Sequence, residues 1–195
     1  RRGWKVKIAG VGADGIVDSG NLLSNLNERT AMVCVMAVNN ETGAIQNVVI
    51  FLSPKPGAAK PKIHPDFEKA AENVLLDNHN CHFEPHIVTM RTTQKLVIKN
   101  SDPVGHNTNA NFLENVSFND LIPAGGSITK SLPKVESAFM PISCSIHPWM
   151  AAKLLVRDDP YAAVSNEKGE LTMPNIPAGK WTFTGTLSHN PPMVR

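Results

Sequence analysis

The chain has 195 residues, of which 18% are charged, and its formal net charge is +2 at pH 7. This length allows one large domain or two small ones with an apolar core, and so small a charge argues against nucleic-acid binding. No apolar run approaches the roughly 20 residues that cross a bilayer, so we predict no membrane span and no polybasic membrane-binding patch.

The pattern along the chain predicts an all-β protein. Short apolar runs are separated by Gly, Pro and Asn, while helical periodicity is scarce. In the N-terminal part we expect strands at 3–10 and 14–20, followed by a hairpin of 31–38 and 45–52. Both runs of this hairpin are almost continuously apolar, so at least one of them should be buried on two faces.

A proline-rich loop and the one sizeable helix are expected next. Residues 53–63 contain three prolines, which favour a loop or linker. The following stretch, 64–78, offers Asp66 as an N-cap before a run of good helix formers. We therefore predict a helix there.

From residue 82 onward, alternation of apolar and polar residues predicts short strands. The candidates are 82–90, 94–100, 127–132 and 153–158. A last strand should carry Trp181 and Phe183 on one face, after a Pro-Ala-Gly turn. We predict a β-sandwich with Greek-key connections. Its parts are a core at 82–157, accessory β-structure at 1–55 plus 158–195, and a loop with a short helix at 56–81.

The segment PISCSIHPWM, residues 141–150, places Cys144, His147 and Met150 at intervals of three. Its two prolines keep it from forming a regular helix, so the three side chains should lie on a loop. A thiolate, an imidazole and a thioether within seven residues can surround one soft metal ion. This loop is our first candidate for a functional site.

His106 supplies a second imidazole for the same ion. It follows the strand predicted at 94–100, in a turn that contains Pro and Gly. Two histidines, one cysteine and a weakly bound methionine are the ligands of blue-copper electron-transfer sites. The thiolate binds copper strongly, the imidazoles suit both oxidation states, and the thioether is too weak to impose a Cu(II) geometry.

These two motifs resemble those of the cupredoxins. The likeness lies in NSDPVGHN at 100–107 and CSIHPWM at 144–150, where the proline after the histidine makes the loop most similar to the amicyanin type. It covers roughly residues 83–157. The resemblance implies a hydrogen-bonding role for Asn107 in bracing the ligand loop. It also implies one type 1 copper, with the ligands His106, Cys144, His147 and a weak axial Met150.

The resemblance further implies one-electron transfer without turnover chemistry, so we do not expect an enzyme. A redox partner protein would dock briefly near Pro148 and Trp149, around the exposed edge of His147. Trp149 could instead simply plug the end of the sandwich. We expect a periplasmic or otherwise exported protein, whose export signal is not in the opening segment because that segment lacks an apolar core.

The flanking parts resemble prealbumin-type modules of the carboxypeptidase regulatory kind. The likeness is in residues 160–183, and in 7–20 together with 47–52. By this resemblance the two ends of the chain would pair, with the copper-binding part inserted between them.

Other interpretations of the same residues stay open at this stage. The ligand set could serve copper binding or delivery, or belong to a structural exported β-protein. Cys144 and His147 could be a catalytic pair, but the sequence shows neither an orienting group nor a substrate cleft. The strongest rival is a structural zinc site, which would leave His106 and Met150 idle. Its ligands would be Cys81, His86, Cys144 and His147.

Two further features are undecided from the sequence. Cys34 and Cys81 could form a disulfide in an exported protein, but sequence does not supply the Cα separation that this requires. His82 and His86 are four apart, which would place them on one face of a single strand. They could bind a second metal with His79, although histidines beside a turn are common without one.

Overall fold

The computed structural model describes residues 47–53, 60–68, 72–166, 170–179 and 181–187. All of them belong to the second of two compact units, Gln46–Arg195. The strands predicted at 3–10, 14–20 and 31–38 lie outside the described residues, as does Cys34. Within the described part, no helix is long and apolar enough to cross a membrane.

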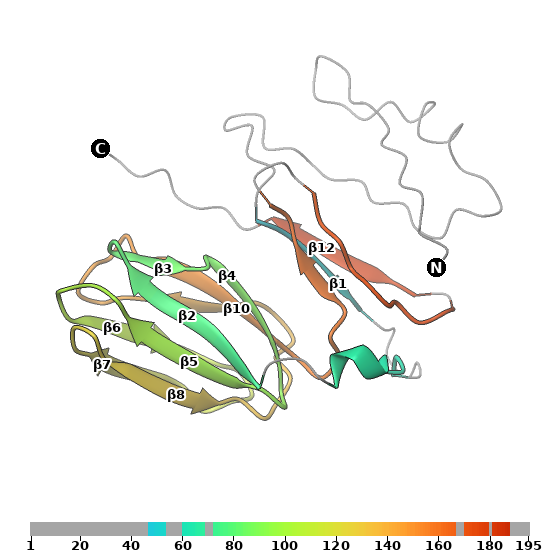
Figure 1. Ribbon diagram of the computed structural model, residues 1–195, viewed down its shortest axis with the longest axis horizontal. Helices are drawn as coiled ribbons and strands as arrows, with labels where there is room; N and C mark the ends of the chain where they lie inside the picture. The colour runs from blue at the N-terminus through green and yellow to red at the C-terminus, as the bar shows by residue number, and fades with distance from the viewer. Residues whose placement is uncertain (1–46, 54–59, 69–71, 167–169, 180, 188–195) are drawn as a thin grey trace, which may run out of the picture. The chain divides into compact units, whose positions relative to one another are not determined.

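Two facing sheets form a β-sandwich, which confirms the predicted all-β class (Figure 1). The four-stranded sheet has the order β3-β2-β5-β8. These strands are His82–Glu84, Asn73–His79, Lys95–Asn100 and Ser127–Ser131, in that order. The five-stranded sheet has the order β4-β10-β9-β6-β7. Its strands are Ile87–Arg91, Ala151–Arg157, Met140–Ser143, His106–Ala110 and Phe118–Ile122.

The main apolar core lies between these two sheets. It contains Leu76 and Ile98 from the four-stranded sheet, and Leu154 and Val156 from β10 in the five-stranded sheet. Leu155, which alternates with the last two along β10, belongs instead to a second apolar cluster. Strand β10 is therefore buried on both faces, which explains its continuous apolar run.

A three-stranded antiparallel sheet has the order β11-β1-β12. Its strands are Ala162–Val164, Val48–Leu52 and Phe183–Leu187. In β1, Val48, Val49, Ile50 and Leu52 are all buried, as expected for a strand covered on two faces. Val49 packs in the second cluster with Ile87 and Leu155, so this sheet contacts β4 and β10. Segments before and after the sandwich thus pair, while their likeness to prealbumin-type modules stays a prediction.

The helix predicted over 64–78 is wrong for most of its length. Among the described residues of this stretch, Pro65–Phe67 form a 3-10 helix, η1, whose N-cap is His64 rather than Asp66. Residues 73–78 belong to β2, because parallel pairing with β5 outweighs the local helix propensity. The sandwich therefore begins at β2, ahead of the boundary predicted at residue 82.

The C-terminal strand is shorter than the sequence pattern suggested. β12 begins at Phe183, so Trp181 lies outside it. The Trp181 indole N–H donates instead to the carbonyl of Pro177 at 2.8 Å. The two aromatic side chains therefore do not share one strand face.

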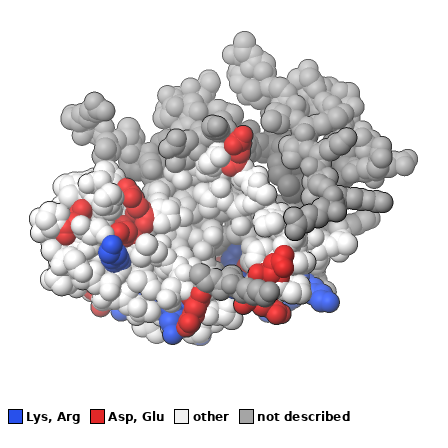
Figure 2. Space-filling view, in the orientation of Figure 1, with Lys and Arg blue, Asp and Glu red and all other residues white. Residues whose placement is uncertain are grey.

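Charges of both signs are scattered over the described surface on the face shown in Figure 2, with a broad uncharged area between them. No continuous basic patch crosses the described residues in this view.

Candidate metal centre

His106 is the first residue of β6, and its side chain is fully buried. Its Nε2 lies 2.8 Å from Oδ2 of Asp102. An ionised carboxylate only accepts hydrogen bonds, so Nε2 carries the ring proton and Nδ1 presents its lone pair. A histidine oriented by a carboxylate in this way is prepared to bind a metal through its other nitrogen.

Asp102 anchors His106 to a neighbouring turn. Its carboxylate also accepts the backbone amides of Asn80 at 2.7 Å and Cys81 at 2.8 Å. Burial alone would raise the pKa of Asp102, but these amides and His106 outweigh it and hold the pKa below its ordinary value. Our sequence reasoning missed Asp102, although it lies within the NSDPVGHN motif that carried the family resemblance.

Cys144 follows β9 and begins the tight loop that leads to β10. The Cys144 amide donates to the Met150 carbonyl at 3.3 Å, and the Met150 amide donates to the His147 carbonyl at 2.9 Å. Cys144 and Met150 are both buried in the core between the sheets. The loop therefore closes on itself and holds Cys144, His147 and Met150 in a fixed relation.

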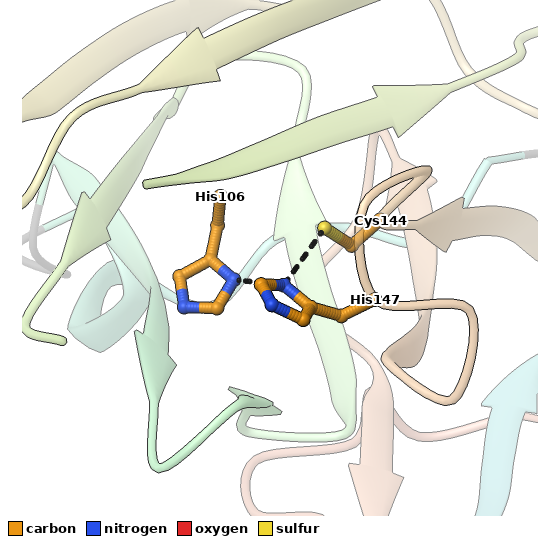
Figure 3. Close-up of side chains that lie close together, drawn as sticks. All are labelled: His106, Cys144 and His147. Atoms are coloured by element: carbon orange, nitrogen blue, oxygen red, sulfur yellow. Dashed lines mark hydrogen bonds between the residues drawn. The ribbon is translucent and has the colours of Figure 1, made fainter. Parts of the chain in front are cut away.

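The ligand atoms of His106, Cys144 and His147 converge at one end of the sandwich (Figure 3). The two Nδ1 atoms of the histidines are 2.9 Å apart, and Cys144 Sγ is 3.8 Å from His147 Nδ1. All three ligand atoms lie within 4.8 Å of one another. The structure thus brings together three of the four predicted ligands, and it buries the fourth, Met150, in the same apolar core as Cys144.

Asn107 fastens the ligand loop to β6. Its Oδ1 accepts hydrogen bonds from the Cys144 thiol at 3.2 Å and from the amides of Ser145 and Ile146 at 2.7 and 3.2 Å. Its Nδ2 donates to Ser145 Oγ at 3.1 Å. These hydrogen bonds hold the ligand loop and the Cys144 sulfur against the start of β6.

The donor chemistry of this cluster fits copper. Two imidazole nitrogens and one thiol sulfur meet at a buried point, and a methionine is buried at the end of the same loop. Nitrogen and soft sulfur donors suit copper, whereas magnesium and calcium prefer oxygen ligands. His106, Cys144, His147 and Met150 are therefore the residues that would hold a copper ion.

Exposed apolar side chains lie next to His147 in the loop. The His147 ring lies beside the Trp149 ring, with 5.2 Å between their centroids. Trp149 is 55% exposed and Ile146 is 52% exposed. The tryptophan is thus more than half accessible, in contrast to the interpretation that it simply plugs the end of the sandwich.

The rival zinc set is not brought together. Cys81 lies within 4.8 Å of Asp102 and His106, so its histidine neighbour is His106 rather than His86. The Nδ1 of His86 is 2.9 Å from the carbonyl oxygen of Ala151. Among the described residues, no candidate metal-binding group includes His86. The pairing of Cys81 with Cys34 stays a prediction, because Cys34 lies outside the described part of the chain.

His82 and His86 do not share a strand face. His82 belongs to β3 in the four-stranded sheet, whereas His86 directly precedes β4 in the five-stranded sheet. The chain crosses from one sheet to the other between them, at Pro85. His79 is the direct cross-strand partner of His82, but its Nδ1 lies 3.1 Å from Glu84 Oε2, and no candidate metal-binding group among the described residues includes either histidine. The three histidines therefore form no common site.

Residues 1–54 match the family model described as aminotransferase class V. This match covers little more than a quarter of the chain and falls almost entirely outside the described residues, so it does not assign the chain to that family. The curated proteins contain no match to this chain.

Solved structures with a related arrangement of strands include copper proteins. A mutant of amicyanin in its Cu(I) form is 12% identical with a TM-score of 0.40, and the match covers 52% of this chain and 95% of that one. A purple cupredoxin from Nitrosopumilus maritimus is 17% identical with a TM-score of 0.36, and the match covers 42% of this chain and 97% of that one. The copper-containing nitrite reductase from Thermus scotoductus is 18% identical with a TM-score of 0.39, and the match covers 50% of this chain and 25% of that one. These scores are low, so the fold class rests on the strand topology of this chain.

Proposed function

We propose that this protein is a type 1 copper protein of the cupredoxin kind, which carries one electron at a time. The observation that carries the proposal is the meeting of His106 Nδ1, His147 Nδ1 and Cys144 Sγ at one buried point. Met150 is the weak axial ligand in this proposal. Copper bound by these residues supplies reversible one-electron chemistry.

The surrounding residues keep the ligands in place. Asp102 holds the Nε2 proton of His106, so that Nδ1 stays directed toward the ligand cluster. Asn107 holds the Cys144 loop against β6 through its amide oxygen. Ligands held this firmly need little rearrangement when an electron arrives or leaves. The burial of His106, Cys144 and Met150 also favours an electron carrier over copper delivery, because delivery requires ligands that are accessible for exchange.

The proposed carrier has no turnover chemistry of its own and acts through a redox partner protein. The exposed Trp149, beside the ring of His147, offers an apolar surface for brief docking. Pro148, which lies between these two residues in the loop, is also exposed. We place this electron transfer in the periplasm or in another exported location, as the family resemblance implies.

Visible absorption and electron paramagnetic resonance spectra with added Cu(II), before and after ascorbate, test the proposal. We expect an intense thiolate-to-copper band that bleaches with ascorbate in the wild type and in Cys81→Ser, and that is absent in Cys144→Ser. Cys81→Ser is the matched control, because it removes a thiol outside the proposed copper ligands. A colourless protein that retains stoichiometric zinc, or a band that survives in Cys144→Ser, would contradict the proposal.

A further inference from the structure

Asp102 and two other donor residues form a second cluster next to the first. The ligand atoms of Cys81, Asp102 and His106 all lie within 4.8 Å of one another. They come from the turn between β2 and β3, from the loop between β5 and β6, and from the first residue of β6. His106 therefore belongs to two candidate clusters, with Nδ1 facing His147 and Nε2 facing Asp102.

We propose that Cys81, Asp102 and the Nε2 of His106 form a second metal site, which takes Zn²⁺ or a similar borderline divalent ion. Cysteine sulfur, histidine nitrogen and carboxylate oxygen are the ligands that zinc accepts in proteins. The Asp102 Oδ1 accepts only the Asn80 amide among the hydrogen bonds observed, so it has a lone pair to offer. Cys81 is partly exposed, which leaves room for water as a fourth ligand.

The turn itself does not account for a cysteine at position 81. Asn80 and Cys81 both have a positive φ, at 54° and 56°. Asparagine is common in this left-handed conformation, whereas most other side chains avoid it. Asn or Gly would form the turn more readily, although the partly buried Cys81 side chain also packs against the main apolar core.

As long as His106 is a neutral imidazole, metal at the second site excludes metal at the first one. A neutral imidazole has a single lone pair, so a metal on Nε2 leaves the ring proton on Nδ1. That proton then points at His147 Nδ1, which is 2.9 Å away, and blocks the side shared with Cys144. The chain therefore holds a metal ion on one side of His106 or on the other, and zinc lowers its capacity for copper.

Cobalt(II) titration of the full chain tests the second site, because a Co(II)–thiolate bond gives a charge-transfer band that zinc does not. Every variant carries Cys34→Ser, so that only the two described cysteines can contribute. With Cys144→Ser added, we expect one equivalent of Co(II) to give a thiolate band that Zn²⁺ abolishes. With Cys81→Ser added as well, the band is lost. No band in the first variant, or a band that persists in the second, would overturn the proposal.

Competition with copper tests the exclusion. In the Cys34→Ser chain, saturation with Zn²⁺ should suppress the thiolate-to-copper band, and Cys81→Ser should restore it. Full copper colour with zinc still bound at Cys81, or suppression that Cys81→Ser does not relieve, would overturn the exclusion. A wild-type chain in which Cys81 is disulfide-bonded when purified without reductant would also overturn the second site. The cobalt titration uses variants that lack Cys144. A missing cobalt band would therefore contradict the second site without bearing on the copper assignment.

Discussion

Two buried polar centres lie near the two ends of β6, and their hydrogen bonds differ in kind. Glu136, 1% exposed, accepts the amides of Leu113, Glu114 and Asn115 at 3.0 to 3.3 Å, which holds the loop that follows β6. At the start of β6, the Nδ1 atoms of the two histidines and the sulfur of Cys144 face one another. A buried carboxylate whose oxygens accept backbone hydrogen bonds stabilises the fold. Lone pairs that converge on one point are instead suited to bind a ligand.

The largest expected effect is the loss of stability on removing the Glu136 carboxylate. Glu136→Ala leaves the three loop amides without their acceptor, and we expect it to lower the free energy of unfolding by about 3 kcal/mol. The copper spectrum of the folded protein should not change. Urea unfolding and the Cu(II) absorption spectrum measure the two effects. The control is Glu72→Ala, which removes an exposed ion pair with Lys95 and should cost at most about 0.5 kcal/mol.

Asp102→Asn should mainly lower the copper affinity, with a smaller effect on stability. The single amide oxygen of asparagine can still accept the Asn80 amide at the Oδ1 position, but the acceptor at Oδ2 for the Cys81 amide and His106 Nε2–H is lost. We expect copper affinity to fall about 10- to 100-fold with a smaller loss of stability than in Glu136→Ala. Competition with a chelator of known affinity measures this change, with Asp158→Asn at the exposed pair with Lys60 as the control. Unchanged affinity would mean that Asp102 serves only the turn.

A smaller effect should appear in the pH dependence of stability. Burial alone would raise the pKa of Glu136, but hydrogen bonds from the Asn115 side chain and the loop amides hold it below the ordinary 4.5. The carboxylate is thus favoured in the folded chain. Its stabilisation is complete above the ordinary pKa and is lost as pH falls through the lower folded pKa.

Urea unfolding of metal-free wild type and Glu136→Gln, from about pH 6 down to about pH 3, measures this contribution. The stability difference between the two proteins should shrink as the pH falls, because the glutamine does not titrate. A difference that stays constant over this range would show that the Glu136 charge is not what holds the loop.

The fold class was predictable because most strands read as short apolar runs between turn residues. The helix prediction failed at β2, because parallel pairing with β5 is a long-range contact that local propensity does not show. Strand β6 was missed for another reason. Its sequence, HNTNA, places the polar residues His106 and Thr108 at buried positions, so no apolar alternation marks it.

The candidate ligands were predictable to a different degree from their supports. Cys144, His147 and Met150 lie within one loop, so their spacing is visible in the sequence. The contact of Asp102 with the turn at Asn80 and Cys81 depends instead on how two separate segments pack. Sequence spacing therefore located the donors, while the contact of Asp102 with His106 became visible only in the fold.

A potentiometric titration of the copper-loaded protein, followed through the thiolate-to-copper band and the paramagnetic resonance signal, tests the central claim most directly. We predict that both signals follow a single one-electron curve and return fully on reoxidation, because His106, Cys144 and His147 are held in place. Irreversible loss of the band, release of copper on reduction, or the absence of any thiolate-to-copper band would contradict a role as an electron carrier.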